Sequence, residues 1–168
     1  MPRAPNKSEL EHKTMTACVR CGGRVKPLQR EGRTTRYQAV AALIIPSDFP
    51  IPTCTSCRAE YLDPALSGRL ARVLQPIYQS VLQSAAAALI EQICKSIPQR
   101  RLELILGLSQ GYLSRLKARA GRPSAALVAL LFLLAEPGAI AAVERYFAGM
   151  LLCHPQNRAR IDRDGDRV

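Results

Sequence analysis

The segments CVRCGG (residues 18–23) and IPTCTSC (residues 51–57) each carry two cysteines separated by two residues. This spacing lets two thiolates reach one tetrahedral metal ion, and two such pairs supply the four ligands of a structural zinc site. Gly22-Gly23 follows the first pair directly, and glycine readily adopts the positive φ that a metal-binding turn needs. We therefore predict that one Zn²⁺ is bound by Cys18, Cys21, Cys54 and Cys57.

Other interpretations of the cysteines stay open at this point. The four thiols could form disulfides or remain buried and unpaired, although nothing else in the sequence indicates an oxidising compartment. Four thiolates also accept iron or cadmium, so the spacing alone does not identify the metal. A structural zinc site is the interpretation that two Cys-x-x-Cys pairs in a basic chain favour most.

The chain between the two cysteine pairs predicts a small antiparallel sheet that returns to the metal. Arg24–Arg30 and Arg33–Gln38 flank Glu31-Gly32 and predict the two strands of a hairpin. Val40–Ile45 is a third apolar stretch, and Pro46 follows it. A unit of this size has too little hydrophobic core to fold alone, so metal binding is expected to supply much of its folding free energy.

From Asp63 onward the sequence is predicted to be helical. Asp63-Pro64 combines an N-cap residue with proline at the first helical position, and apolar residues then recur at helical spacing. Pro76 is expected to divide this stretch into helices near residues 64–74 and 77–96. Cys94 lies at the same spacing and is predicted to be a small, buried apolar residue.

Residues Gln99–Ala118 have the pattern of a helix-turn-helix. The sequence predicts a short helix over Gln99–Leu106, a turn at Gly107-Leu108-Ser109 and a second helix over Gln110–Ala118. In that turn, Gly107 is expected to adopt the left-handed conformation, Leu108 to lie between the helices and Ser109 to N-cap the second helix. In DNA-binding proteins with this motif, the second helix enters the major groove.

Two further helices are expected after the motif. Ser124 is predicted to cap a strongly apolar helix near Ala125–Ala135, which Pro137-Gly138 ends, and Ile140–Phe147 predicts a final amphipathic helix. A metal-bound β unit followed by helices makes an α+β fold. The predicted domains are a flexible arm (1–15), a zinc-binding β domain (16–62), linker helices (63–96), a helix-turn-helix domain (97–150) and a flexible tail (151–168).

Several positions in the helical region match a known DNA-binding pattern. They are Gln99, Leu102, Leu106-Gly107-Leu108-Ser109-Gln110, Tyr112-Leu113-Ser114-Arg115-Leu116 and Arg122-Pro123-Ser124. With these residues the segment resembles the Cro/repressor-type (XRE) fold. Because two Cys-x-x-Cys pairs precede it, residues 16–147 as a whole look like an MqsA-type antitoxin and transcriptional repressor.

That resemblance implies a zinc-binding N-terminal domain that can mask a partner toxin, and a C-terminal domain that dimerises and binds a palindromic operator. It also implies that Arg115 corresponds to the family's DNA-contacting arginine. Gly111 stands where the family often has a base-reading asparagine, so an adenine contact is not carried over to this position. Glu103 occupies a site that is usually a small alanine, and it is expected either to point to solvent or to disturb helix packing.

Side-chain chemistry suggests a role for each candidate DNA contact. Gln110 is able to pair with adenine, Arg115 with guanine or a phosphate, and Gln99 with a phosphate near a helix N-terminus. The basic residues that follow are expected to neutralise phosphates, although each could also be an ordinary exposed charge. Tyr112 is expected to pack against the core rather than to stack on bases. The complete predicted set is Gln99, Ser109, Gln110, Gly111, Ser114, Arg115, Lys117, Arg119 and Arg122.

Composition favours a binding protein over an enzyme. The formal net charge of +11 suits a polyanionic partner, with a solvated basic surface as the simpler alternative. The N-terminus lacks the apolar stretch of a signal peptide, and the most apolar run is far too short for a transmembrane helix, so a cytoplasmic protein is expected.

The two histidines, His12 and His154, lie in no catalytic pattern, and no phosphate-binding glycine motif is present. A Cys153-His154 metal or redox pair has little specificity.

The sequence leads to two functional hypotheses. The first is a homodimeric, sequence-specific regulator that binds double-stranded DNA, most simply an autorepressor of a toxin–antitoxin operon. Its zinc domain would bind a protein toxin or another protein partner, and no membrane partner is expected. The second is a zinc-containing adaptor in a larger nucleoprotein or protein assembly. A zinc-ribbon RNA-binding protein is a more distant alternative, because aromatic stacking positions are sparse.

Overall fold

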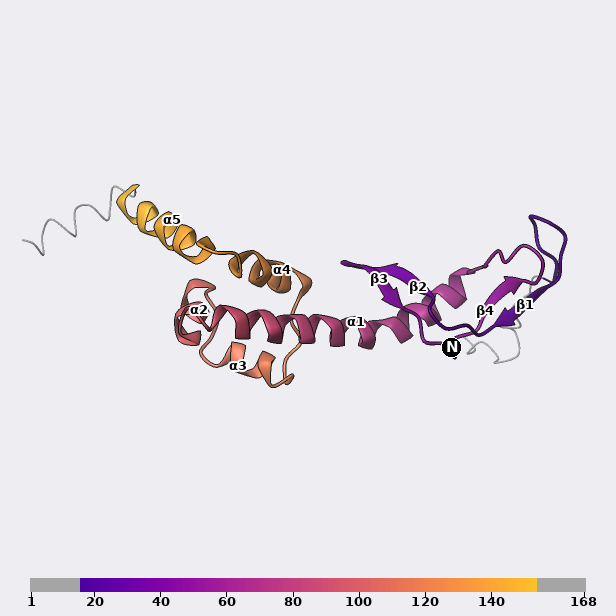
Figure 1. The fold of residues 1–168 in the computed structure, drawn as a ribbon, viewed down its shortest axis with the longest axis horizontal. Helices are drawn as coiled ribbons and strands as arrows, with labels where there is room; N and C mark the ends of the chain where they lie inside the picture. The colour runs from indigo at the N-terminus through magenta and orange to yellow at the C-terminus, as the bar shows by residue number, and fades with distance from the viewer. Residues whose placement is uncertain (1–15, 154–168) are drawn as a thin grey trace, which may run out of the picture. The chain divides into compact units, whose positions relative to one another are not determined.

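A computed structural model of the chain describes residues 16–153 and confirms the α+β fold, with short strands followed by helices (Figure 1). The chain divides into two compact units, Met1–Ile77 (unit 1) and Tyr78–Val168 (unit 2). The division falls inside one helix. The predicted flexible arm, and the predicted flexible tail from residue 154 onward, lie outside the described residues.

Unit 1 contains two separate two-stranded antiparallel sheets. Strand β1 (Val25–Leu28) pairs with β4 (Ile51–Cys54), and β2 (Thr34–Tyr37) pairs with β3 (Val40–Ile44). The prediction that the first two strands form a hairpin is therefore wrong. The structure favours the other pairing because β1 follows the first cysteine pair and β4 leads into the second, so that their ladder brings the pairs together.

A buried arginine joins these two sheets. Arg33 lies just before β2 and is only 3% exposed. Its guanidinium donates to the Leu28 carbonyl (2.9 Å) and to Glu60 Oε1 (3.0 Å), and its backbone carbonyl accepts from the Ile45 N–H (2.9 Å). A buried charge is tolerated only where it is paired and hydrogen-bonded, and Arg33 meets both conditions. The sequence pattern did not single out this residue.

The helix α1 (Pro64–Ile93) is continuous, so the predicted division at Pro76 is wrong. The predicted N-cap is confirmed, because Asp63 Oδ1 accepts from the Leu66 N–H at 2.7 Å. Buried residues recur every four positions on both sides of Pro76, whose own side chain is exposed. These residues are Leu66, Leu70, Leu74, Tyr78, Leu82, Ala86 and Ile90. Burial of this continuous face outweighs the single backbone hydrogen bond that proline cannot make.

In unit 2, three shorter helices lie beside the C-terminal half of α1, and the start of a fourth packs against the same core (Figure 1). They are α2 (Gln99–Ile105), α3 (Tyr112–Lys117), α4 (Ala125–Leu134) and α5 (Ala139–Cys153). Their shared core consists of Ala86, Ile90, Ile93, Leu102, Leu113, Leu116, Leu131 and Leu134. Ala86, in the alanine-rich part of α1, is fully buried in this core, where its small side chain allows the helices to pack closely.

The last two helices were both predicted from the sequence, but their predicted end residues differ from those in the structure. Ser124 caps α4 as predicted, since its hydroxyl accepts from the Leu127 N–H at 3.1 Å. Helix α5 begins at Ala139 and continues past the predicted end at Phe147, as far as Cys153. Across residues 16–153, no single helix is both long enough and apolar enough to cross a bilayer.

Candidate metal centre and nucleic-acid interface

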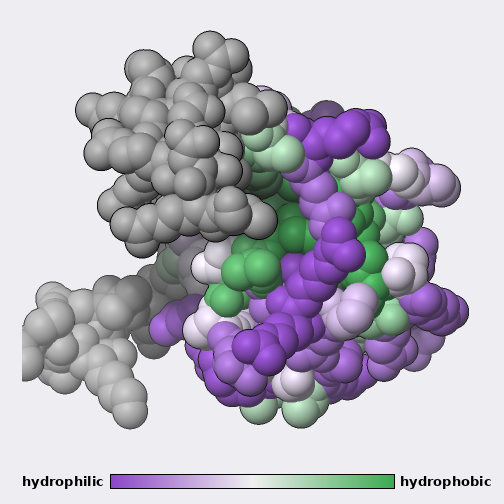
Figure 2. Space-filling model, turned by 90° about the vertical axis from the view of Figure 1, so that its left-hand side faces the viewer, coloured by the Kyte–Doolittle hydropathy of each residue, from purple (hydrophilic) through white to green (hydrophobic). Residues whose placement is uncertain are grey.

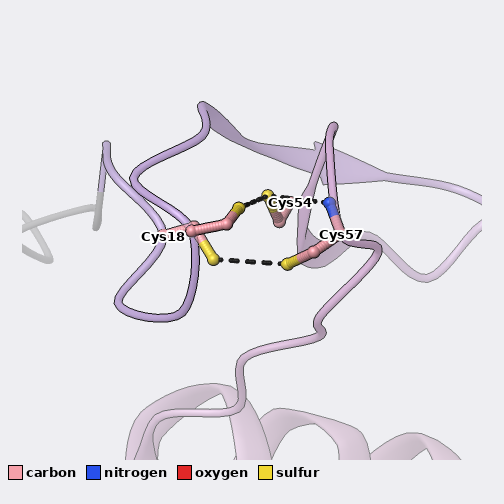
Figure 3. A group of neighbouring side chains, drawn as sticks. Cys18, Cys54 and Cys57 are labelled. Atoms are coloured by element: carbon pink, nitrogen blue, oxygen red, sulfur yellow. Dashed lines mark hydrogen bonds between the residues drawn. The ribbon is translucent and has the colours of Figure 1, made fainter.

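The four predicted metal ligands come together at one end of the β1–β4 ladder. Cys18 and Cys21 lie in the turn before β1, whereas Cys54 ends β4 and Cys57 lies in the turn after it. All four sulfur atoms lie within 4.8 Å of one another. Figure 3 shows the side chains of Cys18, Cys54 and Cys57 facing one another. This is the arrangement that a single four-thiolate metal site needs.

The sulfur–sulfur distances fit metal ligands and not disulfides. Cys18 Sγ lies 3.5 Å from Cys57 Sγ, and Cys21 Sγ lies 3.5 Å from Cys54 Sγ. Two ligands of a tetrahedral zinc with bonds of about 2.3 Å stand roughly 3.8 Å apart, whereas a disulfide bond measures about 2.05 Å. Each of these distances joins a cysteine of the first Cys-x-x-Cys pair to a cysteine of the second, so a bound ion would connect the two turns.

The two turns have the same backbone design. In the first, the Gly22 N–H donates to the Cys18 carbonyl (2.8 Å), and in the second the Arg58 N–H donates to the Cys54 carbonyl (3.1 Å). Gly22 has φ +69°, as predicted, and Arg58 takes the corresponding position with φ +62°. Gly23 is needed for space, because a Cβ there would lie 2.6 Å from Ser56 Oγ.

Hydrogen bonds to sulfur support the negative charge that metal ligands carry. The backbone N–H of Arg20 donates to Cys18 Sγ at 3.4 Å, and the backbone N–H of Ser56 donates to Cys54 Sγ at the same distance. The Tyr61 hydroxyl lies 2.9 Å from Cys18 Sγ. Tyr61 was not predicted as part of the site. The sequence feature that could have indicated it is an aromatic residue only four positions after Cys57, in a chain with few aromatic residues.

The four thiols lie close enough for neighbouring thiolates to repel one another, which opposes ionisation of all four together. The hydrogen bond from Tyr61, with backbone N–H groups assisting, lowers the pKa of Cys18 to about 6. The hydrogen bond from the Gly23 N–H acts to lower the pKa of Cys21. The hydrogen bonds of Cys21 with the other three cysteines act in the opposite direction and outweigh this effect, so the pKa of Cys21 is raised to about 12. A divalent cation would compensate the repulsion between thiolates and let all four bind as ligands.

In unit 2, a buried glutamate joins the two helices of the predicted helix-turn-helix. Glu103 lies in α2 and is only 4% exposed. Its Oε1 accepts from the Leu113 N–H (3.0 Å) and its Oε2 from the Gly111 N–H (3.1 Å). The expectation that Glu103 points to solvent or disturbs the packing is therefore wrong. The carboxylate occupies the N-terminal end of α3 and satisfies backbone donors that would otherwise lack partners.

The Glu103 pKa reflects this arrangement. Burial acts to raise the pKa, but the N–H groups of Gly111 and Leu113, the Gln99 amide and the positive charge of Arg115 outweigh it, so the pKa is lowered from its usual value of 4.5. The carboxylate is thus held ionised at neutral pH.

Gln99 extends the same network. Its amide nitrogen donates to Glu103 Oε1 (3.1 Å) and to Ser114 Oγ (2.7 Å), which connects the first residue of α2 with the exposed side of α3. The phosphate contact by Gln99 stays a prediction. In the structure, this side chain orients Ser114, another residue of the predicted DNA-binding set.

The turn between α2 and α3 is longer than predicted, and α3 is shorter. Gly107 is left-handed as expected (φ +63°), but a second left-handed residue, Gly111 (φ +78°), interrupts the chain before α3 begins at Tyr112. The predicted N-cap at Ser109 is wrong, because the capping position is Gly111 and no side chain at that position caps the helix. Gln110 therefore lies in the turn and is exposed. The backbone conformation also explains why glycine occupies position 111.

The remaining residues of the predicted set lie on and after α3. Ser114 and Arg115 are exposed, and the Arg115 guanidinium lies 5.8 Å from the centre of the Tyr112 ring. Tyr112 packs against the core of unit 2, as expected. Lys117 is half-buried, whereas Arg119 and Arg122 are exposed in the segment before α4.

Cys94 is half-buried against the core of unit 2, in agreement with its predicted apolar role.

Comparison of the chain with protein-family models, with curated proteins and with solved structures gives no match. The function is therefore inferred from the residues of this chain.

Proposed function

We propose that this protein is a transcriptional regulator that binds specific double-stranded DNA by inserting α3 into the major groove. The observation that carries the proposal is the Glu103 network, which fixes α3 against α2 through backbone N–H groups. On α3, Leu113 and Leu116 are buried while Ser114 and Arg115 are exposed. A helix held in this way presents polar side chains outward on a rigid base, as direct reading of base edges requires.

The distribution of charge supports the same proposal. Arg115, Arg119 and Arg122 are exposed on and after α3, and the chain as a whole has a formal net charge of +11. Basic side chains that neutralise phosphates supply much of the affinity of a protein for DNA through counterion release. Arg115 has the fork geometry that pairs with guanine, while the later arginines are suited to phosphates.

The biological setting we propose is that of an MqsA-type antitoxin that represses its own operon as a cytoplasmic homodimer. The cysteine cluster would hold structural zinc, and four thiolates would fill a tetrahedral shell, so we assign unit 1 to protein binding rather than catalysis. A toxin is the partner that the resemblance suggests for unit 1. An adjacent gene for a small ribonuclease-like toxin would support this setting.

A second candidate function is that of an adaptor in a larger assembly. The observation that favours it is the length of α1, which at 30 residues exceeds what a minimal helix-turn-helix domain needs. In that case unit 2 would bind DNA without sequence preference, or not at all.

Selection of duplex DNA from a random pool by the full-length, metal-loaded protein separates the two functions. A regulator is expected to enrich an inverted repeat whose half-sites lie about 10 base pairs apart or a multiple of that distance. The enrichment should disappear with Arg115→Glu, which reverses an exposed charge on α3, and persist with Arg36→Glu, which does the same on β2. Recovery of DNA without any consensus would contradict the regulator and favour the adaptor.

A further inference from the structure

Tyr61 is fixed in position by the backbone that follows the second cysteine pair. Its N–H donates to the Pro52 carbonyl at 2.9 Å, and the Cys54 N–H donates to the Ala59 carbonyl at the same distance. The segment after the second metal-binding turn therefore runs back along β4, antiparallel to it. The Tyr61 side chain packs against the small core that surrounds the cysteine cluster. This backbone pairing and packing bring the Tyr61 hydroxyl to the cluster.

The hydroxyl of Tyr61 contacts one of the four metal ligands. It lies 2.9 Å from the sulfur of Cys18, a residue that is only 4% exposed. A thiolate that binds a metal has no proton to donate, so in the metal-bound protein the hydroxyl is the donor and the sulfur is the acceptor. Among the described residues, Cys18 is the one ligand whose sulfur has a side-chain donor from outside the cluster.

This hydrogen bond connects two distant parts of the chain. Cys18 opens the first metal-binding turn, whereas Tyr61 follows the second turn and lies 43 positions later. A bound ion would connect the same two turns. The hydrogen bond therefore favours the arrangement of sulfur atoms that the ion needs, as partners of metal ligands commonly do.

We propose that Tyr61 is a positioning residue of the metal centre, whose hydroxyl holds the Cys18 thiolate in place and slows the loss of the metal. Tyr61 acts through Cys18 and is not itself a ligand. This inference rests on the metal centre included in the proposed function, and it does not depend on DNA binding.

The burial of Cys18 makes the hydroxyl important. Cys21 and Cys57 are exposed, so water is able to solvate their sulfur atoms, whereas Cys18 is buried. Removal of the hydroxyl leaves a buried thiolate without one of its donors, and water does not easily replace it. Partners of this kind typically change the affinity for a metal by about 10- to 100-fold.

Two conservative variants separate this role from packing. Tyr61→Phe keeps the ring that packs beside the cluster and removes only the hydroxyl. Tyr37→Phe is the matched control, because it removes another hydroxyl of unit 1. The Tyr37 hydroxyl hydrogen-bonds to Gln75 Oε1 at 2.8 Å and has no contact with the cysteine sulfurs.

The test is the rate at which the full-length, zinc-loaded protein transfers zinc to an excess of a chromophoric chelator. Tyr61→Phe is expected to release zinc at least tenfold faster than wild type, and Tyr37→Phe at the wild-type rate. Figure 2 shows hydrophobic residues exposed at one end of unit 2, so dilute protein is used to keep association between molecules out of the measurement.

The absorption spectrum of the cobalt-loaded protein gives a second readout, which loss of packing alone would not reproduce. A hydrogen bond lowers the energy of the sulfur lone pairs. Its loss in Tyr61→Phe should therefore move the sulfur-to-cobalt charge-transfer band to longer wavelength, while the spectrum of Tyr37→Phe should match that of wild type.

Equal zinc-release rates for wild type and Tyr61→Phe would overturn the proposal. So would faster release with an unchanged cobalt spectrum, since that result would assign the effect to packing, and so would equal acceleration by Tyr37→Phe. These outcomes leave the metal centre itself intact. A wild-type protein that binds neither zinc nor cobalt would instead contradict the metal centre of the proposed function, and this inference with it.

Discussion

Removal of the metal is expected to unfold unit 1 and leave unit 2 folded. Around the cysteine cluster, the buried apolar residues are few: Val25 packs with Cys18 and Cys54, beside half-buried Ala59 and Tyr61. Binding of structural zinc to four thiolates contributes on the order of 10 kcal/mol to folding at neutral pH, which exceeds what so small a cluster supplies. Unit 2 has a separate core from α1 to α4 and does not contain the cluster.

Hydrogen exchange read by mass spectrometry tests this expectation peptide by peptide. After chelation, confirmed by elemental analysis, peptides from residues 16–62 should exchange at the rate of an unfolded chain, and those from residues 78–150 should stay protected. Cys54→Ser should reproduce the effect without a chelator. Cys94→Ser is the matched control, because this thiol lies in unit 2 outside the cluster. Retained protection of residues 16–62 in metal-free protein would contradict the structural role of the metal.

Glu103→Ala is expected to destabilise unit 2 more than any substitution on the exposed side of α3. The alanine leaves the Gly111 and Leu113 N–H groups without their acceptor, and the Leu113 bond is buried. Loss of a buried acceptor that serves two donors should lower the melting temperature of unit 2 by on the order of 10 °C. Glu91→Ala removes an exposed acidic residue of α1 as the control and should change the melting temperature little.

The same carboxylate makes the stability of unit 2 depend on pH. Because the folded-state pKa of Glu103 lies below its usual value of 4.5, its contribution is complete above that value and is lost as the pH falls through the folded pKa. Glu103→Gln keeps the shape of the side chain but does not titrate. The stability difference between wild type and this variant should therefore shrink below pH 4.5. A difference that stays constant from pH 7 to pH 3 would show that the carboxylate is not held ionised by the α3 backbone.

The features that could be predicted from the sequence are those that depend on residues close to one another along the chain. Two residues between paired cysteines bring four sulfurs together, and the positive φ of Gly107 and the cap at Ser124 follow from neighbouring residues. The structure does not identify the metal, so zinc stays a prediction. The pairing of β1 with β4 was missed because it depends on contacts between distant segments, which the metal-binding turns and Arg33 determine.

The errors in the helical unit have a similar origin. Pro76 was expected to break α1, but the buried face on either side of it is a property of tertiary packing, which local propensity does not contain. The Glu103 network was missed because a charged residue in a short helix is ordinarily exposed. Its partners lie eight and ten residues later and become neighbours only when the turn folds back.

The affinity of Arg115→Ala for the DNA selected by wild type tests the central claim most directly. Measured by fluorescence anisotropy with full-length, metal-loaded protein, Arg115→Ala should bind this DNA about 1–3 kcal/mol more weakly, or roughly 5- to 150-fold, while its affinity for random duplex changes much less. Arg36→Ala, an equally simple loss of charge on β2, should leave the specific affinity close to that of wild type. Equal affinities of wild type and Arg115→Ala for the selected DNA would contradict the assignment of α3 as the helix that reads it.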